Sequence, residues 1–179
     1  MAEPGSTRIV LAEDCIPDVI LVKETLRAAG IEVELKVFSD GEECVRYLIS
    51  CEEPPHAIIL DLNLPRVDGF ELLRVVRSER RYAGVPVAVL TSSRAAEDRQ
   101  RSLDLGANAF ITKPSKLDDF LQTVGSAIRR LLGATGSEAI LRATCPPKRQ
   151  AARRSRTRQG RFRTRTRRLG CLPTSFAGG

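Results

Sequence analysis

Short apolar runs alternate five times with helix-length amphipathic segments over most of the chain. The runs at residues 8–12, 57–60 and 85–90 are nearly continuous in apolar side chains, which is typical of parallel strands buried on both faces. Two further runs, at residues 34–38 and 109–112, complete the set. Strand–helix alternation of this kind predicts an α/β domain with a doubly wound, five-stranded parallel sheet covered by helices on both faces.

The predicted helices lie between and after these runs. Pro17 stands where the first turn of a helix tolerates proline, and Gly30 stands where a helix commonly ends. The fourth helix has only Leu103 and Leu105 as large apolar residues, so we expect it to be held loosely against the core. The five helices are expected near residues 17–29, 41–50, 69–80, 94–105 and 116–132.

Charge divides the chain into two unlike parts. Residues 143–179 contain eleven Lys or Arg and no acid, so the 29 bases and 22 acids of the chain leave 18 bases against 22 acids in residues 1–142. The net charge of +7 therefore combines a mildly acidic domain with a strongly basic tail. We expect a flexible N-terminus at residues 1–6, one folded domain at 7–133 and a disordered tail at 134–179, where large apolar residues are too few to form a core.

Composition also argues against several classes of protein. No apolar run approaches the ~20 residues of a membrane-spanning helix, and residues 1–8 lack the basic-then-apolar pattern of a secretory signal. A cytoplasmic protein without a membrane partner is therefore expected. The five cysteines form no CxxC pair, and His56 is the single histidine, so a zinc site is not expected. Cys44 falls within an apolar helical pattern and is predicted to be a small core residue.

Charged and hydroxylic side chains follow four of the five predicted strands. Glu13 and Asp14 come after the first strand, Asp61 after the third, Thr91 at the end of the fourth and Lys113 after the fifth. Because the carboxyl ends of parallel strands meet at one edge of a doubly wound sheet, these groups should converge. Three carboxylates together need a cation, and such oxygen ligands suit Mg²⁺. With a lysine, a hydroxyl and a nucleophilic carboxylate, they form a site that stabilises a phosphoryl group.

The order of these motifs resembles the receiver domain of response regulators. The resemblance covers residues 7–132, and it implies a flavodoxin-like fold and a part in two-component (phosphorelay) signal transduction. Its motifs are Glu13-Asp14, Leu60-Asp-Leu-Asn-Leu-Pro65 with Asp68-Gly69, Leu90-Thr-Ser92 and Thr112-Lys-Pro114. More narrowly, Leu11-Ala-Glu-Asp14 with Pro17-Asp-Val19, and the stretch from Ser102 to Asn108, resemble single-domain regulators that partner phytochrome-like sensor histidine kinases.

The resemblance implies a phosphoacceptor and a metal site. Asp61 would accept a phosphoryl group from a kinase histidine and form an acyl phosphate. Glu13 and Asp14 would hold Mg²⁺ together with Asp61 and the backbone carbonyl of Asn63. Lys113 would pair with the phosphoryl oxygens. The phosphoryl donor would be a sensor histidine kinase or a histidine phosphotransfer protein.

The resemblance also implies a switch. Thr91 would bond to a phosphoryl oxygen, and Phe110 matches an aromatic residue that turns inward when the threonine moves. The Lys113–Pro114 peptide bond would be cis. Two residues depart from the family pattern: Cys15 takes a place where asparagine is frequent, and Ser93 is small and uncharged. We expect these departures to alter the start of the first helix and the hydrolysis of the phosphoryl group, respectively.

Each of these residues also has a plainer interpretation. Asp14 and Asp61 could cap helices, as aspartate often does, but Lys113 would then need a separate explanation. Phe110 could be a core aromatic residue. Gly69 is expected to serve a turn or a helix end rather than to contact a ligand, and the same holds for Gly106.

Three functions are compatible with the sequence. The first is a phosphoacceptor module whose face at residues 94–132 reports phosphorylation to a downstream partner that the sequence does not identify. The second is an aspartate-nucleophile phosphohydrolase, which typically carries an acid two residues after the nucleophile, where this chain has Asn63. The third is a nucleic-acid-binding regulator acting through the Arg-rich tail, whose binding would be nonspecific and electrostatic. A homodimer is left open.

Overall fold

A computed structural model describes residues 7–133, and the segments 1–6 and 134–179, predicted to be flexible or disordered, lie outside the described residues. Within the described range, five strands form one sheet in the order β2-β1-β3-β4-β5, and every neighbouring pair is parallel. This topology confirms the predicted doubly wound sheet. The strands are β1 (Thr7–Ala12), β2 (Val33–Phe38), β3 (Ala57–Leu60), β4 (Val87–Thr91) and β5 (Ala109–Thr112).

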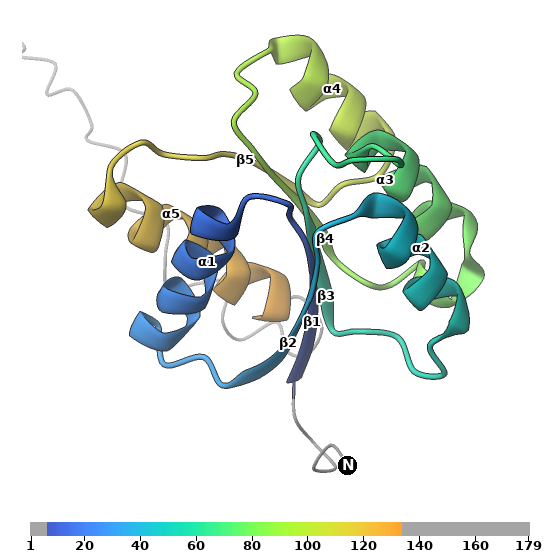
Figure 1. The fold of residues 1–179 in the computed structure, drawn as a ribbon, viewed down its shortest axis with the longest axis horizontal. Coiled ribbons are helices and arrows are strands. Elements are labelled where there is room, and N and C mark those ends of the chain that lie inside the picture. Colours follow the sequence, from blue (N-terminus) through green and yellow to red (C-terminus); the bar gives the residue numbers. More distant parts are fainter. Residues whose placement is uncertain (1–6, 134–179) are drawn as a thin grey trace, which may run out of the picture. The chain divides into compact units, whose positions relative to one another are not determined.

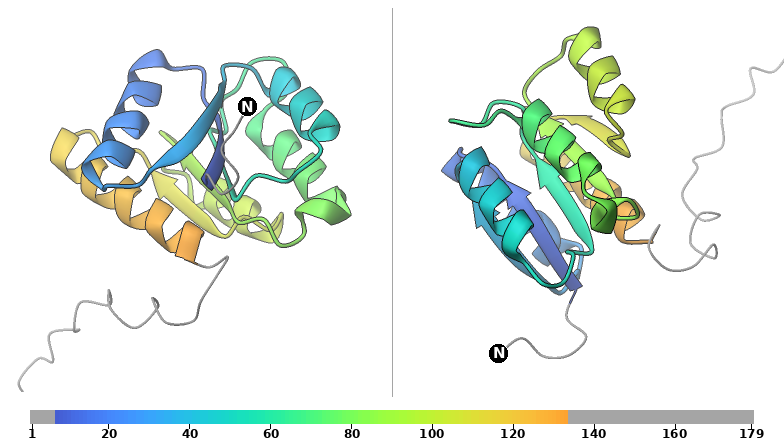
Figure 2. Two further views of the ribbon diagram at one scale, coloured as in Figure 1. Left: turned by 90° about the horizontal axis from the view of Figure 1, so that it is seen from below. Right: turned by 90° about the vertical axis from the view of Figure 1, so that its right-hand side faces the viewer.

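Helices cover both faces of the sheet. Figures 1 and 2 show α1 and α5 on one face, and α2 and α3 on the other with α4 beside them. No helix among residues 7–133 combines the length and the apolar character that crossing a bilayer requires. The helices are α1 (Ile16–Ala28), α2 (Gly41–Ser50), α3 (Gly69–Ser78), α4 (Ala96–Asp104) and α5 (Leu117–Gly133), with a short 3₁₀ helix, η1 (Arg80–Tyr82).

The core has two halves, one on each face of the sheet. Strand β3 shows the division, because all four of its residues are buried. Ala57 and Ile59 pack with α1 and α5, whereas Ile58 and Leu60 pack with α2 and α3. Successive side chains of a strand point to opposite faces, so a strand covered on both sides must be apolar throughout. Cys44 of α2 is fully buried in the second half, as predicted.

Local sequence accounts for several helix starts. Asp40 caps α2, since its Oδ1 accepts hydrogen bonds from the backbone N–H groups of Glu42 and Glu43 at 2.7 and 3.2 Å. Asp68 caps α3 in the same way. Pro17 lies in the first turn of α1, as predicted. Cys15, at the N-cap of α1, makes no side-chain cap, which agrees with the expectation that this helix starts differently.

Several element boundaries differ from the prediction by one residue, and three differ by two: the end of the third helix, the start of the fourth strand and the start of the fourth helix. The third helix was expected to reach residue 80, but α3 ends at Ser78 and η1 follows, because Tyr82 turns into the core and its hydroxyl donates to the carbonyl of Leu48. The fourth strand was expected from residue 85, but β4 begins at Val87. Pro86 has no N–H to donate to the sheet, so regular pairing starts after it.

The weak packing expected of the fourth helix is confirmed. Ser102 is the buried residue of α4, and Leu103 remains 38% exposed. Two arginines of α4 lie over aromatic rings instead: the guanidinium carbon of Arg101 is 3.9 Å from the ring centroid of Phe70, and that of Arg99 is 5.8 Å from the ring centroid of Phe110. Helix α4 is therefore held mainly by contacts at its surface.

Candidate functional site

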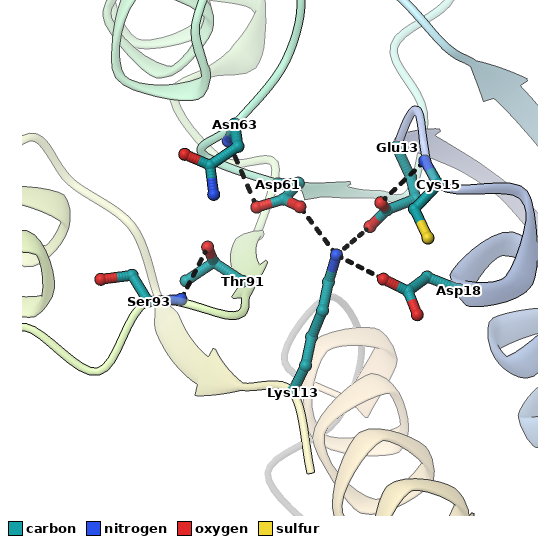
Figure 3. Close-up of polar contacts among 8 residues, drawn as sticks. All are labelled: Glu13, Cys15, Asp18, Asp61, Asn63, Thr91, Ser93 and Lys113. Carbon is teal, nitrogen blue, oxygen red and sulfur yellow. Dashed lines mark hydrogen bonds and ion pairs between the residues drawn. The ribbon is translucent and has the colours of Figure 1, made fainter. Parts of the chain in front are cut away.

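The ammonium group of Lys113 lies among three carboxylates at the carboxyl edge of the sheet (Figure 3). Its Nζ is 2.7 Å from Asp61 Oδ2, 2.7 Å from Glu13 Oε2 and 2.8 Å from Asp18 Oδ2. The lysine side chain is 10% exposed, so these ion pairs are largely shielded from water. The predicted convergence of the strand ends is present, and it includes one residue, Asp18, that the sequence did not indicate.

Strand pairing positions Lys113. It follows β5, and its backbone N–H donates to the carbonyl of Thr91 at 2.7 Å, which continues the β4–β5 ladder by one residue. Burial by itself lowers the pKa of Lys113. The nearby carboxylates of Asp18, Asp61 and Glu13 outweigh burial and raise that pKa above its usual value, so the lysine stays charged.

Glu13 is the most deeply buried acid of the site. It follows β1 and is 1% exposed. Its Oε1 accepts a hydrogen bond from the backbone N–H of Cys15 at 3.2 Å, while its Oε2 faces the Lys113 ammonium without hydrogen-bond geometry. Burial raises the pKa of Glu13 to about 7, although Lys113 lowers it. When it is ionised, this buried carboxylate therefore lacks some of the stabilisation that water would give it, and a bound cation could replace that stabilisation.

Glu13, Asp14 and Asp61 form a set that fits a small divalent cation. One carboxylate oxygen from each of them lies within 4.8 Å of the other two. Asp14 is exposed, which leaves a side of the set open to solvent. Their oxygens are the ligands that Mg²⁺ prefers, and an open side allows the ion to keep some of its waters. The buried, incompletely bonded Oε2 of Glu13 gives an independent sign that the set is short of positive charge.

Asp61 lies directly after β3 and is 4% exposed. Its backbone N–H donates to the carbonyl of Ala12 at 2.9 Å, and its Oδ1 accepts from the N–H of Asn63 at 3.3 Å. The loop after Asp61 packs closely against α3: a Cβ atom on Gly69 would lie 2.1 Å from the Asp61 carbonyl oxygen. Gly69 begins α3, as expected of a helix-end glycine, and it also lets the helix approach the acceptor loop.

Thr91 is fully buried at the end of β4 and connects to α4. Its Oγ1 accepts from the N–H of Ser93 at 3.3 Å. The Ser93 hydroxyl in turn donates to Asp98 Oδ2 of α4 at 2.5 Å, and the Ser93 carbonyl accepts from the hydroxyl of Thr112. Ser93 therefore connects Thr91 to α4 and to β5. The small, uncharged character of Ser93 in the sequence does not predict this connecting role.

Phe110 lies in β5 and is half-buried. Its ring packs against the core half that contains α3, and its carbonyl accepts from Arg99 Nη1 at 3.4 Å. Both the core interpretation and the switch interpretation of this residue therefore retain support.

The prediction of a cis Lys113–Pro114 bond was wrong, because residues 7–133 contain no cis peptide bond. The trans isomer is intrinsically favoured even before proline, and Lys113 reaches all three carboxylates with it. Asp18 was missed because its carboxylate approaches Lys113 only in the folded chain. Its position four residues after Asp14, in the first turn of a helix that begins at the site, was the available signal.

Comparison with known proteins agrees with this geometry. A model of the response regulator receiver domain matches residues 9–125. The response regulator Rcp1 of Synechocystis is 36% identical over 121 residues, which cover 65% of this chain and 82% of Rcp1. The crystal structure of Mn²⁺-bound Rcp1 matches with a TM-score of 0.66 at 32% identity, covering 71% of this chain and 95% of that chain.

Two further solved structures are similar. The phosphorylated cyanobacterial phytochrome response regulator RcpA has a TM-score of 0.68 at 33% identity, covering 74% of this chain and 98% of that chain. The receiver domain of the sensor histidine kinase PA1611 from Pseudomonas aeruginosa, with magnesium in its active-site cleft, has a TM-score of 0.58 at 26% identity and coverages of 72% and 99%.

These matches decide between the phosphoacceptor and the phosphohydrolase, whereas the nucleic-acid-binding hypothesis concerns the tail, which lies outside the described residues. Receiver domains are phosphoacceptors of histidine kinases rather than enzymes that turn over a substrate. Among the relatives, the Rcp1 structure is Mn²⁺-bound and the PA1611 receiver holds magnesium in its active-site cleft. The expected divalent cation has a matching acidic cluster in this chain. The chain therefore belongs to the response regulator receiver family and acts as a phosphoacceptor in two-component signalling.

Proposed function

We propose that Asp61 is the phosphoacceptor of this receiver. A carboxylate oxygen of Asp61 attacks the phosphorus of a phosphohistidine, the new O–P bond forms an acyl phosphate, and the P–N bond breaks with its electron pair going to the imidazole nitrogen. The observation that carries this proposal is the contact of Asp61 with Lys113 at 2.7 Å, at the centre of the acidic cluster. Glu13 also follows a central strand and lies 2.7 Å from Lys113, but only Asp61 accepts a hydrogen bond from the ammonium with good geometry.

Glu13 and Asp14 would hold Mg²⁺ together with Asp61 and the backbone carbonyl of Asn63. The bound ion would supply positive charge to the carboxylates and to the phosphoryl oxygens. The donor set supports this assignment, since it consists of oxygens only and includes the buried Oε2 of Glu13. Lys113 provides the second positive charge, and it stays protonated in its acidic surroundings.

Asp61 can be tested directly. The protein is incubated with Mg²⁺ and a small acyl-phosphate donor, and the phosphoryl group is counted by intact mass. We expect uptake by the wild type and none by Asp61→Asn, because the amide is not a nucleophile of comparable strength. Asp68→Asn is the matched control, since Asp68 caps α3 nearby and asparagine also caps helices. Equal uptake by wild type and Asp61→Asn would contradict the proposal.

We infer that phosphorylation is read out on the face formed by residues 94–132. Thr91 would bond to a phosphoryl oxygen, and its movement would reach α4 through Ser93 and Asp98, whose side chains are 2.5 Å apart. The weak anchoring of α4 supports this inference, because switching elements come from regions of low local stability. Phe110 would move inward as Thr91 leaves its place. Hydrogen exchange that is unchanged over residues 91–115 upon phosphorylation would contradict this inference.

We also propose a phytochrome-like sensor histidine kinase as the phosphoryl donor, working with this protein in the cytoplasm. The support is the similarity to RcpA, described as a cyanobacterial phytochrome response regulator, and to Rcp1. Phosphotransfer can be compared from an autophosphorylated phytochrome kinase, an unrelated histidine kinase and a histidine phosphotransfer protein. We expect the phytochrome kinase to transfer fastest. Faster transfer from either of the others would overturn this assignment.

A further inference from the structure

We propose that Asp18 is a positioning residue that holds the Lys113 ammonium in place for phosphotransfer to Asp61. The proposal rests on the function proposed for Asp61. Asp18 Oδ2 lies 2.8 Å from Lys113 Nζ, a distance equal within 0.1 Å to those from Glu13 and Asp61. Figure 3 shows the Asp18 side chain reaching the ammonium from α1, beside Glu13.

The start of α1 places Asp18. Pro17 occupies the first turn, and the backbone N–H of Asp18 donates to the carbonyl of Cys15 at 3.0 Å. Proline restricts the backbone and is well suited to a helix start, so the following residue has a defined direction. The Asp18 side chain is 23% exposed, which shields its ion pair with Lys113 in part.

Asp18 differs from the other two carboxylate partners of Lys113 because it is not expected to bind the Mg²⁺ ion. Glu13 and Asp61 belong, with Asp14, to the all-carboxylate set that fits Mg²⁺. Asp18 belongs only to a second group, with Glu13 and Cys15, whose thiol is a poor ligand for Mg²⁺. A metal ion would compete with Lys113 for the oxygens of Glu13 and Asp61. Asp18 is then the carboxylate partner that Lys113 keeps.

The geometry of an ammonium group makes this contact useful. Lysine has three N–H donors on a flexible stem. One of them bonds to Asp61 Oδ2, while the ammonium charge also faces the carboxylates of Glu13 and Asp18. When Asp61 becomes phosphorylated, the donor directed at Asp61 must turn to a phosphoryl oxygen at nearly the same place. A fixed contact with Asp18 limits the positions of Nζ and keeps that donor directed at the acceptor, which lowers the ordering needed in the transition state.

The test compares phosphorylation rates from an acyl-phosphate donor at saturating Mg²⁺. We expect Asp18→Ala to slow phosphorylation about tenfold, as the loss of one charge-assisted hydrogen bond predicts. Asp18→Asn, which keeps an acceptor oxygen but no charge, should lie between Asp18→Ala and the wild type. Glu24→Ala is the matched control, because it removes a carboxylate of the same helix that pairs with Arg27 on the surface. An unchanged rate in Asp18→Ala would overturn the proposal.

A double-mutant cycle separates positioning from a general structural or electrostatic effect. In a Lys113→Ala background, Asp18→Ala should change the rate less than twofold, because the group that it positions is gone. A persistent tenfold effect there would contradict the proposal. In the metal-free protein, the Lys113 ammonium protons should give an NMR signal in slow exchange with water, which Asp18→Ala weakens. An identical signal in both proteins would also contradict it.

The outcomes distinguish this proposal from the one on which it rests. If Asp61→Asn abolishes uptake while Asp18→Ala phosphorylates at the wild-type rate, Asp61 remains the acceptor and the positioning role of Asp18 is wrong. If Asp61→Asn takes up as much phosphate as the wild type, the acceptor assignment itself fails, and the positioning proposal fails with it.

Discussion

Helices α4 and α5 flank the same edge strand, β5, and they are held by different kinds of contact (Figure 1). Helix α5 places an apolar stripe in the core, formed by Phe120, Val124, Gly125, Ile128 and Leu131. Helix α4 buries Ser102, and its other contacts include the Ser93–Asp98 hydrogen bond, a hydrogen bond from Arg99 to the Phe110 carbonyl and two arginine–aromatic contacts. Burial of apolar area stabilises α5, whereas α4 depends on weak polar contacts that can be exchanged at small cost.

The site and the α4 surface of this small domain thus rest on different kinds of packing. The α5 side carries the packing that keeps the sheet, and therefore the strand ends, in place. The α4 side is linked to Thr91 through Ser93, so the proposed movement of Thr91 would reach a helix that buries few apolar side chains.

The largest effect is expected from truncating the α5 stripe. Phe120 is 1% exposed, so Phe120→Ala should lower the free energy of unfolding by about 3–5 kcal/mol through lost burial and a cavity. Leu103→Ala in α4 is the matched variant, at 38% exposure, and it should change that free energy by less than about 1 kcal/mol. Urea unfolding followed by circular dichroism measures both. Similar losses in the two variants would remove the contrast between the helices.

A smaller effect should come from overfilling the contact between α5 and α1. A Cβ atom on Gly125 would lie 3.2 Å from Thr25 Cγ2, so Gly125→Leu should lower the free energy of unfolding by about 1–3 kcal/mol. Gly133→Leu, at the end of the same helix, is the control, because no atom lies within 4 Å of a Cβ there. If Gly125→Leu were as stable as its control, α5 would pack against α1 more loosely than its buried stripe indicates.

A residue that caps the N-terminus of helix α4 should stabilise that helix. Ala95 is its N-cap and makes no side-chain hydrogen bond. Ala95→Ser should supply one and raise the local stability of α4 by about 0.5–1 kcal/mol, slowing amide hydrogen exchange in Ala96–Asp104. Exchange in α5 should not change. If protection rose equally in both helices, α4 would open only with the whole domain, and the proposed independence of α4 would be wrong.

An effect of similar size and opposite sign is expected at an arginine–aromatic contact. Arg101→Gln removes the charge over the ring of Phe70 and should lower the local stability of α4 by about 0.5–1 kcal/mol. Hydrogen exchange within α4 should become faster, while the midpoint of urea unfolding stays within error. A clear shift of that midpoint would mean that α4 belongs to the same cooperative unit as the core.

Much of the fold could be predicted because its signals are local. The continuous apolar run at residues 57–60 indicated a strand covered on both faces, and the polar residues of α4 indicated weak anchoring. The end of α3 at Ser78 could not be predicted in this way. It depends on a hydrogen bond between the Tyr82 hydroxyl and the carbonyl of Leu48, a residue far away in the chain. Helical periodicity in the sequence does not indicate such a long-range contact.

The candidate site could likewise be predicted from the sequence only in part. The meeting of Glu13, Asp14, Asp61 and Lys113 could be predicted from the sequence, because parallel strands bring their carboxyl ends to one edge and each of these residues follows a strand. The place of Asp18 and the trans form of the Lys113–Pro114 bond became clear only in the folded chain. Asp18 lies within a helix, and the direction of its side chain depends on how α1 packs on the sheet, which is set by long-range burial rather than by the residues next to it.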